Sequence, residues 1–267
     1  MSIFTNYFND KKKRRKTDKM DIGKEKYILR DTSPFHVTEA YKMLRTNIMF
    51  SIPDEKCRKI MISSPNQHEG KSITSINLGI VFAQNNAKVL LIDCDLRLPT
   101  IAKKLEISSV PGLSNMLIGL SEKEAVIHHL ENGLDVIPAG EIPPNPSELL
   151  GSAKMKTLIQ GLEEDYDYII LDTPPVNVVS DSLNLLSMVS GVALVIRCNV
   201  ANQESVDTAV NKLKLTGAKI FGFVVTGADS IQKRYYKKNG YGKEYSYGYG
   251  YGYDSAVQKK ETEKRKT

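Results

Sequence analysis

The stretch Lys59–Ser72 (KIMISSPNQHEGKS) constrains the fold of this chain more than any other. Its apolar run Ile60–Ile62 predicts a short buried strand, and a helix is expected over about 72–84. Between them, Gly70-Lys71-Ser72 is typical of the end of a phosphate-binding loop, in which backbone N–H groups and the Lys hold phosphates and the Ser hydroxyl binds Mg²⁺. Pro65 stands where the strict pattern has its first Gly, so a strand-to-helix turn with a solvated Lys is the other interpretation.

The remainder of the chain alternates short apolar runs with segments of helical periodicity. The apolar runs predict strands at 88–93, 134–138, 168–172, 192–197 and 220–226. Helices are expected at 37–50, 111–120, 121–130, 147–162, 182–188 and 205–215. This alternation predicts an α/β fold, a mostly parallel twisted sheet with helices on both faces.

Acidic residues follow two of these strands. Asp93 and Asp95 end the run at 88–93, and Asp172 ends the run at 168–172. Because right-handed crossovers bring the carboxyl ends of parallel strands to one edge, these carboxylates should meet Gly70–Ser72 there and form a nucleotide site. The other interpretation of Asp93 and Asp95 is a pair of cap or turn residues. A dinucleotide site of the Rossmann type is disfavoured, because no G-x-G-x-x-G follows a strand.

The net charge of +6 is unevenly distributed along the 267 residues. Residues 1–30 and 233–267 each carry ten Lys/Arg against four Asp/Glu, whereas residues 31–232 carry seventeen against twenty-three. We therefore expect a flexible basic arm at 1–34, a nucleotide-binding domain at 35–232 and a disordered tail at 233–267. Basic arms suit an anionic partner such as nucleic acid or an acidic membrane leaflet, although solvated tails look the same.

Other features favour a cytoplasmic protein. No apolar run approaches the roughly 18 residues of a membrane helix, and the first residues lack the apolar core of a secretory signal. The three cysteines, at positions 57, 94 and 198, are too few and too scattered for a disulfide framework or a metal site.

The tail holds eight of the chain's 13 tyrosines, interleaved with Gly and Lys. Such low-complexity sequence cannot build a core. Exposed phenols can accept phosphoryl groups, or they can stack on the bases of single-stranded nucleic acid, and both interpretations stay open on composition alone. The eight candidates are Tyr235, Tyr236, Tyr241, Tyr245, Tyr247, Tyr249, Tyr251 and Tyr253.

The helix expected at 37–50 carries Glu39, Lys42 and Arg45 at a spacing of three on its polar side. One interpretation is a charged contact face for a neighbouring subunit. The other is a surface helix packed on the sheet, where pairs at this spacing contribute only about 0.2–0.5 kcal/mol.

Taken together, the motifs resemble those of the bacterial tyrosine kinases (BY-kinases) of capsule and exopolysaccharide operons, specifically the separate cytoplasmic kinase chain of Gram-positive bacteria. The resemblance covers about residues 35–253. It rests on the loop SSPNQHEGKS (63–72), the motifs VLLIDCDLR (89–97) and IILDTPP (169–175), the segment PPNPSELL (143–150) and the tyrosine cluster. It implies a P-loop NTPase fold related to partition and positioning ATPases (ParA/MinD-like), and a kinase that uses ATP and Mg²⁺ to autophosphorylate its tail in trans.

The resemblance also implies roles for individual residues. Nucleotide would be bound by Glu69, Gly70, Lys71, Ser72, Ile73 and Arg97. Mg²⁺ would be held by Ser72, Asp95 and Asp172, and the catalytic set would be Lys71, Asp93, Asp95 and Asp172, with Asp93 as the base towards tyrosine.

Two positions depart from the family pattern. The family's subunit-packing helix reads Glu-x-x-Arg-x-x-Arg, and here Lys42 replaces the first Arg, which removes a bidentate fork from the expected ring contact. His68 stands where the family usually has Gly, so the loop is strained if that position needs a positive φ.

The family's partners are a membrane protein whose cytoplasmic tail activates the kinase, further copies in a ring, and a cognate tyrosine phosphatase; no specific nucleic acid is expected. These imply a cytoplasmic location at the inner face of the membrane and a role in regulating polysaccharide synthesis and export. Two alternatives remain: a partition or positioning ATPase that binds DNA or membrane through its basic arms, and a non-enzymatic nucleic-acid-binding module. The first alternative usually has a Lys early in its loop, where this chain has Asn66.

Overall fold

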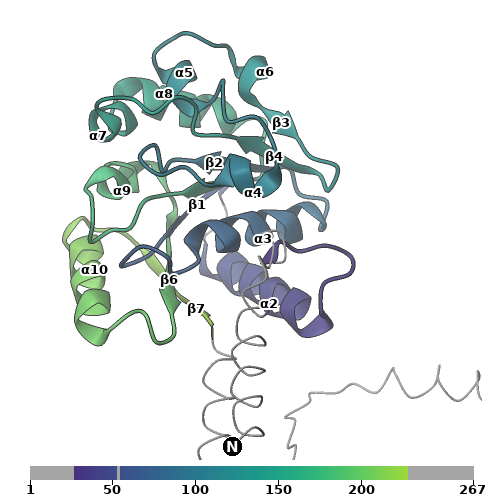
Figure 1. Cartoon of the computed structure of the whole chain (residues 1–267), viewed down its shortest axis with the longest axis vertical. Coiled ribbons are helices and arrows are strands. Elements are labelled where there is room, and N and C mark those ends of the chain that lie inside the picture. The colour runs from purple at the N-terminus through teal and green to yellow at the C-terminus, as the bar shows by residue number, and fades with distance from the viewer. Residues whose placement is uncertain (1–26, 53–54, 228–267) are drawn as a thin grey trace, which may run out of the picture. The chain divides into compact units, whose positions relative to one another are not determined.

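The computed structural model describes residues 27–52 and 55–227, which contain one sheet of seven strands (Figure 1). The strands lie in the order β3-β4-β2-β5-β1-β6-β7, so β5 occupies the centre between β2 and β1. All neighbouring pairs are parallel except β3 with β4. The bounds are β1 Arg58–Ser63, β2 Val89–Asp93, β3 His128–His129, β4 Leu134–Ile137, β5 Tyr168–Asp172, β6 Gly191–Arg197 and β7 Ile220–Thr226.

Helices cover both faces of the sheet, as the sequence predicted (Figure 1). Residues of α2, α3 and α4 belong to the apolar core on one face, and residues of α5, α8 and α10 belong to the core on the other. The bounds are α2 Phe35–Ser51, α3 Lys71–Ala83, α4 Ile101–Leu105, α5 Leu113–Leu117, α6 Lys123–Val126, α7 Pro146–Leu150, α8 Ala153–Leu162, α9 Asp181–Asn184, the 3₁₀ turn η2 Leu186–Met188 and α10 Gln203–Leu215.

The two cores arise from the alternation of side chains along each central strand. In β5, Ile170 packs with the α2–α3 side, whereas Ile169 and Leu171 pack on the opposite side. Successive side chains of a strand point to opposite faces, so a strand buried on both sides must be apolar throughout. This is why the strands were recognisable as continuous apolar runs.

The predicted helix at 121–130 is wrong in its second half. The helix there, α6, ends at Val126, and residues 128–129 form β3, which pairs antiparallel with β4 at the edge of the sheet. The helix expected over 147–162 is divided at Gly151 and Ser152. The Ser152 hydroxyl accepts a hydrogen bond from the Met155 N–H at 3.2 Å and starts α8 as a new helix.

Part of the segment assigned to the basic arm belongs to the folded body. Leu29 is only 6% exposed, and its N–H donates to Asn77 Oδ1 on α3 at 2.9 Å. The Asn77 side-chain amide in turn donates to the Tyr27 carbonyl at 2.8 Å. The rest of that arm, residues 1–26, and the predicted tail at 233–267 lie outside the described residues. Within the described part, no helix combines the length and apolar character that a membrane crossing requires.

Candidate active site

The phosphate loop connects β1 to α3 at the carboxyl edge of the sheet, where the sequence placed it. Gly70 is the N-cap of α3 with a φ of 97°, a left-handed conformation that favours glycine. His68 also lies in the left-handed region, with a φ of 64°. The position therefore has the positive φ on which the expected strain depends, and the strain itself stays a prediction.

The first turn of α3 leaves several backbone donors available. The first bonded N–H in this turn is that of Thr74, which donates to the Gly70 carbonyl at 3.0 Å. Within residues 55–227, the N–H groups of residues 69–73 donate to no protein acceptor. A helix N-terminus with free N–H groups carries a partial positive charge, which makes this turn a suitable anion site.

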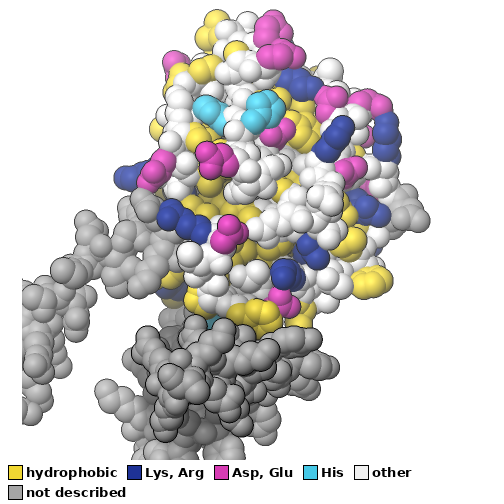
Figure 2. Space-filling model, turned by 90° about the vertical axis from the view of Figure 1, so that its right-hand side faces the viewer, with side chains coloured by type: hydrophobic (Ala, Val, Ile, Leu, Met, Phe, Trp, Pro, Cys, Tyr) yellow, Lys and Arg dark blue, Asp and Glu magenta, His cyan; other side chains and the backbone are white. Residues whose placement is uncertain are grey.

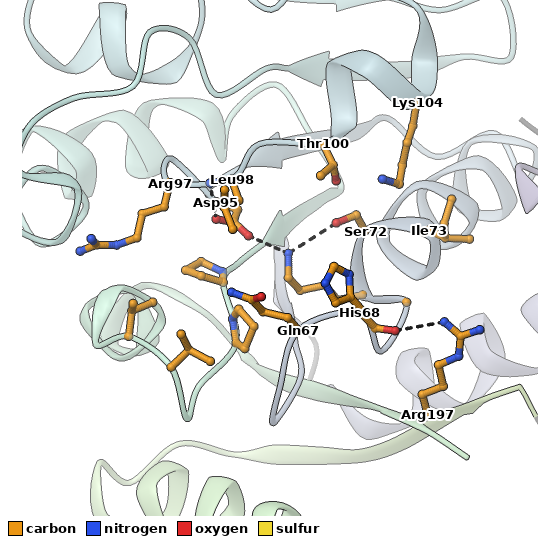
Figure 3. A pocket seen from close by; sticks show the side chains of 16 residues that line it. Gln67, His68, Ser72, Ile73, Asp95, Arg97, Leu98, Thr100, Lys104 and Arg197 are labelled. Atoms are coloured by element: carbon orange, nitrogen blue, oxygen red, sulfur yellow. Dashed lines mark hydrogen bonds and ion pairs between the residues drawn. The ribbon is translucent and has the colours of Figure 1, made fainter. Parts of the chain in front are cut away.

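The Lys71 ammonium lies within a cluster of oxygen atoms, and Figure 3 labels two of the residues that supply them, Ser72 and Asp95. Its Nζ lies 2.8 Å from Asp95 Oδ2, 3.8 Å from Asp172 Oδ2 and 3.5 Å from Ser72 Oγ. Burial alone would lower the pKa of the Lys71 ammonium, but the nearby charges of Asp172 and Asp95 outweigh it, so the pKa is raised. Lys71 is therefore held as a cation beside the loop amides.

Asp172 presents one oxygen, Oδ2, that accepts no hydrogen bond within residues 27–52 and 55–227, although the Lys71 ammonium lies 3.8 Å away. Its side chain is fully buried, Oδ1 accepts a hydrogen bond from Ser75 Oγ at 2.9 Å, and Oδ2 lies in the buried cluster without a hydrogen-bond donor. Burial raises the pKa of Asp172, while Lys71 acts in the opposite direction. An unsatisfied carboxylate oxygen, the Ser72 hydroxyl and Asp95 are hard oxygen donors of the kind that Mg²⁺ prefers together with phosphate and water.

These ligands are fewer than a metal cage built by protein alone would need. Among the described residues, no group of three or more His, Cys, Asp or Glu side chains is arranged to hold a metal ion. This fits Mg²⁺, which keeps several waters and uses one or two carboxylates plus substrate phosphates.

Asp93 is fully buried and serves as a cap within the loop that follows β2. Its Oδ1 accepts from the N–H of Asp95 at 3.1 Å, and its Oδ2 accepts from the N–H groups of Thr100 at 3.2 Å and Ile101 at 3.1 Å. Burial, and next the charge of Asp172, raise the pKa of Asp93 to about 7. That pKa suits a base near neutral pH, whereas the three N–H contacts match the interpretation as a cap residue, so the base role stays a prediction.

Three further residues from the predicted nucleotide set have distinct surroundings. Ile73 lines the pocket beside the loop. Arg97 also lines it, but its guanidinium makes a two-pronged ion pair with the buried Asp181 at 2.7 and 3.1 Å. The Glu69 side chain is buried beneath the loop, where Oε1 accepts from the Asn66 amide at 3.3 Å and burial raises the pKa of the carboxyl.

The pocket at this edge has a volume of about 270 Å³. Several residues that line it had no binding or catalytic role predicted from the sequence, namely Gln67, His68, Leu98, Thr100, Lys104, Pro174, Pro175, Val178, Val179 and Arg197. Arg197 could have been found by the rule that found Asp172, because it also ends a strand that runs towards this edge. Lys104 lies on the short helix α4, for which no motif gave a signal.

The predicted oligomer-contact residues lie on α2. Lys42 Nζ pairs with Glu39 Oε1 at 2.9 Å, and both side chains are exposed, at 47% and 43%. Arg45 instead turns towards its own chain, and its Nη1 donates to the Val81 carbonyl on α3 at 2.7 Å. Arg45 thus helps to pack α2 on α3, as the interpretation of a surface helix expected, and the subunit contact stays a prediction.

Comparison with known proteins identifies relatives over most of the chain. The protein-family model described as "AAA domain" matches residues 57–220. The chain is 39% identical over 206 residues to the tyrosine-protein kinase YwqD of Bacillus subtilis, covering 77% of this chain and 85% of that protein. It is 35% identical over 190 residues to the putative tyrosine-protein kinase CapB of Staphylococcus aureus, covering 71% and 83%. Some relatives are much longer: the tyrosine-protein kinase ptk of Acinetobacter johnsonii, 38% identical over 70% of this chain, is matched over 26% of its length.

Solved structures give the same result. The chimerical protein CapA2B2 superposes with a TM-score of 0.69 at 35% identity, over 73% of this chain and 85% of that one. The kinase domain of the Escherichia coli tyrosine kinase ETK gives a TM-score of 0.68 at 33% identity, over 80% of each chain. The septum site-determining protein MinD of Pyrococcus horikoshii, complexed with Mg-ADP, shares the fold at 22% identity, over 64% of this chain and 72% of that one, with a TM-score of 0.55. The chain has the P-loop NTPase fold and belongs to the family of bacterial tyrosine-protein kinases.

Proposed function

We propose that this chain transfers the γ-phosphoryl group of Mg²⁺-bound ATP to tyrosines of its own C-terminal cluster, on another copy of the chain. The observation that carries the proposal is the buried cluster of Lys71, Ser72, Asp95 and Asp172 against a helix start with free N–H groups. Phosphoryl transfer mainly requires that the protein position the phosphates and stabilise the charge of the transition state, and this cluster can do both.

Each residue of the cluster has a defined task in this proposal. The N–H groups of residues 69–73 and the Lys71 ammonium bind the phosphates, and Ser72, Asp95 and Asp172 hold Mg²⁺. Bound Mg²⁺ would neutralise charge that develops on the transferred group. The Ser75 hydroxyl fixes Oδ1 of Asp172 and leaves Oδ2 directed at the cluster.

We assign the base towards tyrosine to Asp93, since a pKa of about 7 allows it to accept a proton near neutral pH. Asp93→Asn separates this role from the cap role. Loss of transfer with wild-type binding of Mg²⁺-ADP would support the base, whereas loss of both would mark Asp93 as a loop cap alone.

The transfer itself is tested by mixing two full-length variants with ATP and Mg²⁺ and probing with anti-phosphotyrosine antibody. The donor carries Phe at the eight tail tyrosines and cannot accept phosphate there. The acceptor carries Asp172→Asn, which keeps the shape of the side chain and an oxygen for Ser75 but removes the charge that Mg²⁺ needs. We expect phosphotyrosine on the acceptor only when the donor is present.

Two results would contradict the proposal. If wild-type chain labels itself at every dilution while the acceptor stays unlabelled in the mixture, transfer is intramolecular. If the Asp172→Asn acceptor is labelled in the absence of the donor, the cluster around Lys71 does not carry out the transfer.

The wider setting is also proposed from family membership. The domain would begin before the predicted boundary at residue 35, since Tyr27 and Leu29 form hydrogen bonds with Asn77, and would extend to residue 232, flanked by a basic arm and the tyrosine-rich tail. The kinase would act in the cytoplasm at the inner face of the membrane, together with a membrane-bound activator. It would form a ring through the helix bearing Glu39, Lys42 and Arg45. A cognate phosphatase would remove the phosphoryl groups, and the kinase would regulate capsular or exopolysaccharide synthesis and export. Light scattering at low salt tests the ring, and a strict monomer at tens of micromolar would contradict it.

The alternative of a partition or positioning ATPase that binds DNA or membrane through its basic arms is less well supported, because relatives of 35–39% identity are named tyrosine-protein kinases. Most of the two arms lies outside the described residues. On the face shown in Figure 2, basic and acidic side chains are interspersed, so that face offers no continuous basic surface for the phosphate backbone. The MinD structure supports the fold alone at 22% identity.

A further inference from the structure

Two hydrogen bonds connect the phosphate loop to the last residues of β6 and β7. Arg197 Nη1 donates to the His68 carbonyl at 3.1 Å, as Figure 3 shows. Thr226 Oγ1 donates to the Glu69 carbonyl at 2.8 Å. Arg197 and Thr226 are direct register partners in the parallel pair β6–β7. Consecutive carbonyls of the loop are thus held by opposite residues of two strands.

The planarity of the peptide bond gives these contacts a directional effect. In a trans peptide unit the C=O and N–H groups point in opposite directions. The His68 carbonyl shares its peptide unit with the Glu69 N–H, and the Glu69 carbonyl shares its unit with the Gly70 N–H. Holding both carbonyls from the β6–β7 side therefore turns both N–H groups away from those strands. In Figure 3, Asp95 lies on the opposite side of the loop from Arg197.

The loop needs such support, because its backbone is in an unfavourable conformation. His68 has a φ of 64°, a left-handed conformation that is unfavourable for a residue other than glycine. Such conformations persist only where the surroundings determine them. Thr226 also packs against Gly70: its methyl and hydroxyl groups lie 3.5 Å from the position that a Cβ would occupy there.

We propose that Thr226, together with Arg197, is a positioning residue that holds the phosphate loop in its nucleotide-binding conformation. The inference rests on the proposed function, because it takes the nucleotide phosphates as the ligand of the loop. Thr226 is not among the residues that line the pocket, so it acts through Glu69 and Gly70. Arg197 lines the pocket and can also meet the nucleotide directly, so Thr226 gives the cleaner test.

The test compares three full-length variants by calorimetric titration with Mg²⁺-ADP. Thr226→Val removes the hydroxyl while keeping the branched shape, and we expect Kd to rise about three- to tenfold, as for the loss of one neutral hydrogen bond. Thr226→Ser keeps the hydroxyl and should bind Mg²⁺-ADP with wild-type affinity. The matched control is Thr216→Val, which removes a hydroxyl that donates to the Leu213 carbonyl at 2.7 Å at the end of α10; it should leave Kd unchanged.

A kinetic measurement separates positioning from a general loss of structure. For tail phosphorylation, Thr226→Val should raise KM for ATP and leave kcat at saturating ATP unchanged, since bound nucleotide restores the loop. Wild-type affinity in Thr226→Val, a failure of Thr226→Ser to restore affinity, or a kcat that falls while KM stays the same would each overturn the inference alone. Absence of Mg²⁺-ADP binding by the wild-type chain would instead overturn the proposed function and, with it, the inference.

Discussion

Replacing Lys71 by Met should destabilise the protein in the absence of nucleotide, and by an amount that depends on pH. The Lys71 side chain is 12% exposed, and it lies 2.8 Å from the 7%-exposed Asp95 and 3.8 Å from the unexposed Asp172. At an effective dielectric constant of about 20, ion pairs at these distances gain about 4–6 kcal/mol each before the cost of desolvation. Removing one partner of a buried cluster leaves its charges uncompensated, so we expect a loss of about 3–5 kcal/mol at pH 8.

The loss should become smaller at pH 5. Burial raises the pKa of Asp172 above its unfolded value, and Lys71 opposes this, so Lys71→Met raises that pKa further. A carboxyl whose pKa is higher in the folded state lowers stability above that pKa, and this penalty shrinks as pH falls from the folded-state pKa towards the unfolded one. For each proton bound in this way, the free energy of unfolding rises by about 1.4 kcal/mol per unit decrease in pH. Lys71 also lowers the pKa of Asp93, which is about 7 in the wild-type chain, so Lys71→Met raises this pKa too, and its effect on the loss appears as pH falls from 8 towards 7.

Urea unfolding of the apo protein at pH 8 and at pH 5 measures the loss of unfolding free energy at each pH. The matched control is Lys59→Met, because Lys59 Nζ lies at the same distance, 2.8 Å, from Glu163 Oε1 but the two side chains are 18% and 32% exposed. We expect that control to lose no more than about 1 kcal/mol at either pH. A loss below about 1 kcal/mol for Lys71→Met at pH 8, or equal losses at both pH values, would refute the reasoning.

Substitutions at three further positions test other parts of the site in the apo protein. His68→Gly should relieve the left-handed backbone and raise the thermal midpoint by about 2–4 °C, and an unchanged or lower midpoint would argue against strain. Ser75→Ala should cost about 1.5–3 kcal/mol in urea unfolding at pH 8, because the buried Asp172 loses a charged hydrogen bond. Arg97→Ala should cost a similar amount, about 1.5–3 kcal/mol, by leaving Asp181 buried without its cation, and Arg97→Lys should recover only part of it because Lys lacks the fork. A loss below about 0.5 kcal/mol for either alanine variant would contradict these roles.

The parts of the fold that sequence could predict are those that follow from local pattern. A strand buried on both faces must be apolar, so β2 and β5 could be recognised, and the rule of parallel strand ends brought Asp95 and Asp172 to Lys71. The edge strand at 128–129 could not be recognised, because two residues carry no period and their pairing with β4 is made only in the folded sheet.

Most side-chain partners within the site could not be predicted from the sequence. The position of Asp93 after a strand allowed a cap role to be foreseen, but nothing in the motif VLLIDCDLR indicates that Arg97 turns to Asp181, 84 positions away. The contact of Thr226 with the Glu69 carbonyl spans 157 positions and depends on the register of β6 with β7. Contacts of this kind are set by tertiary structure, which local propensity does not encode.

The central position of β5 has a consequence for how the chain folds. Arg58 of β1 pairs with Tyr168 of β5, and Val89 of β2 pairs with the same residue, so β1 and β2 become neighbours of a common strand only after a long intervening segment has been made. Closing such loops before their contacts form is slow, and high contact order lowers folding rates. A nascent chain that has not yet reached Tyr168 has its phosphate loop but no central strand, and it lacks Asp172 to complete the cluster around Lys71. The ability to hold a nucleotide should therefore arise late during synthesis, together with the closing of the sheet.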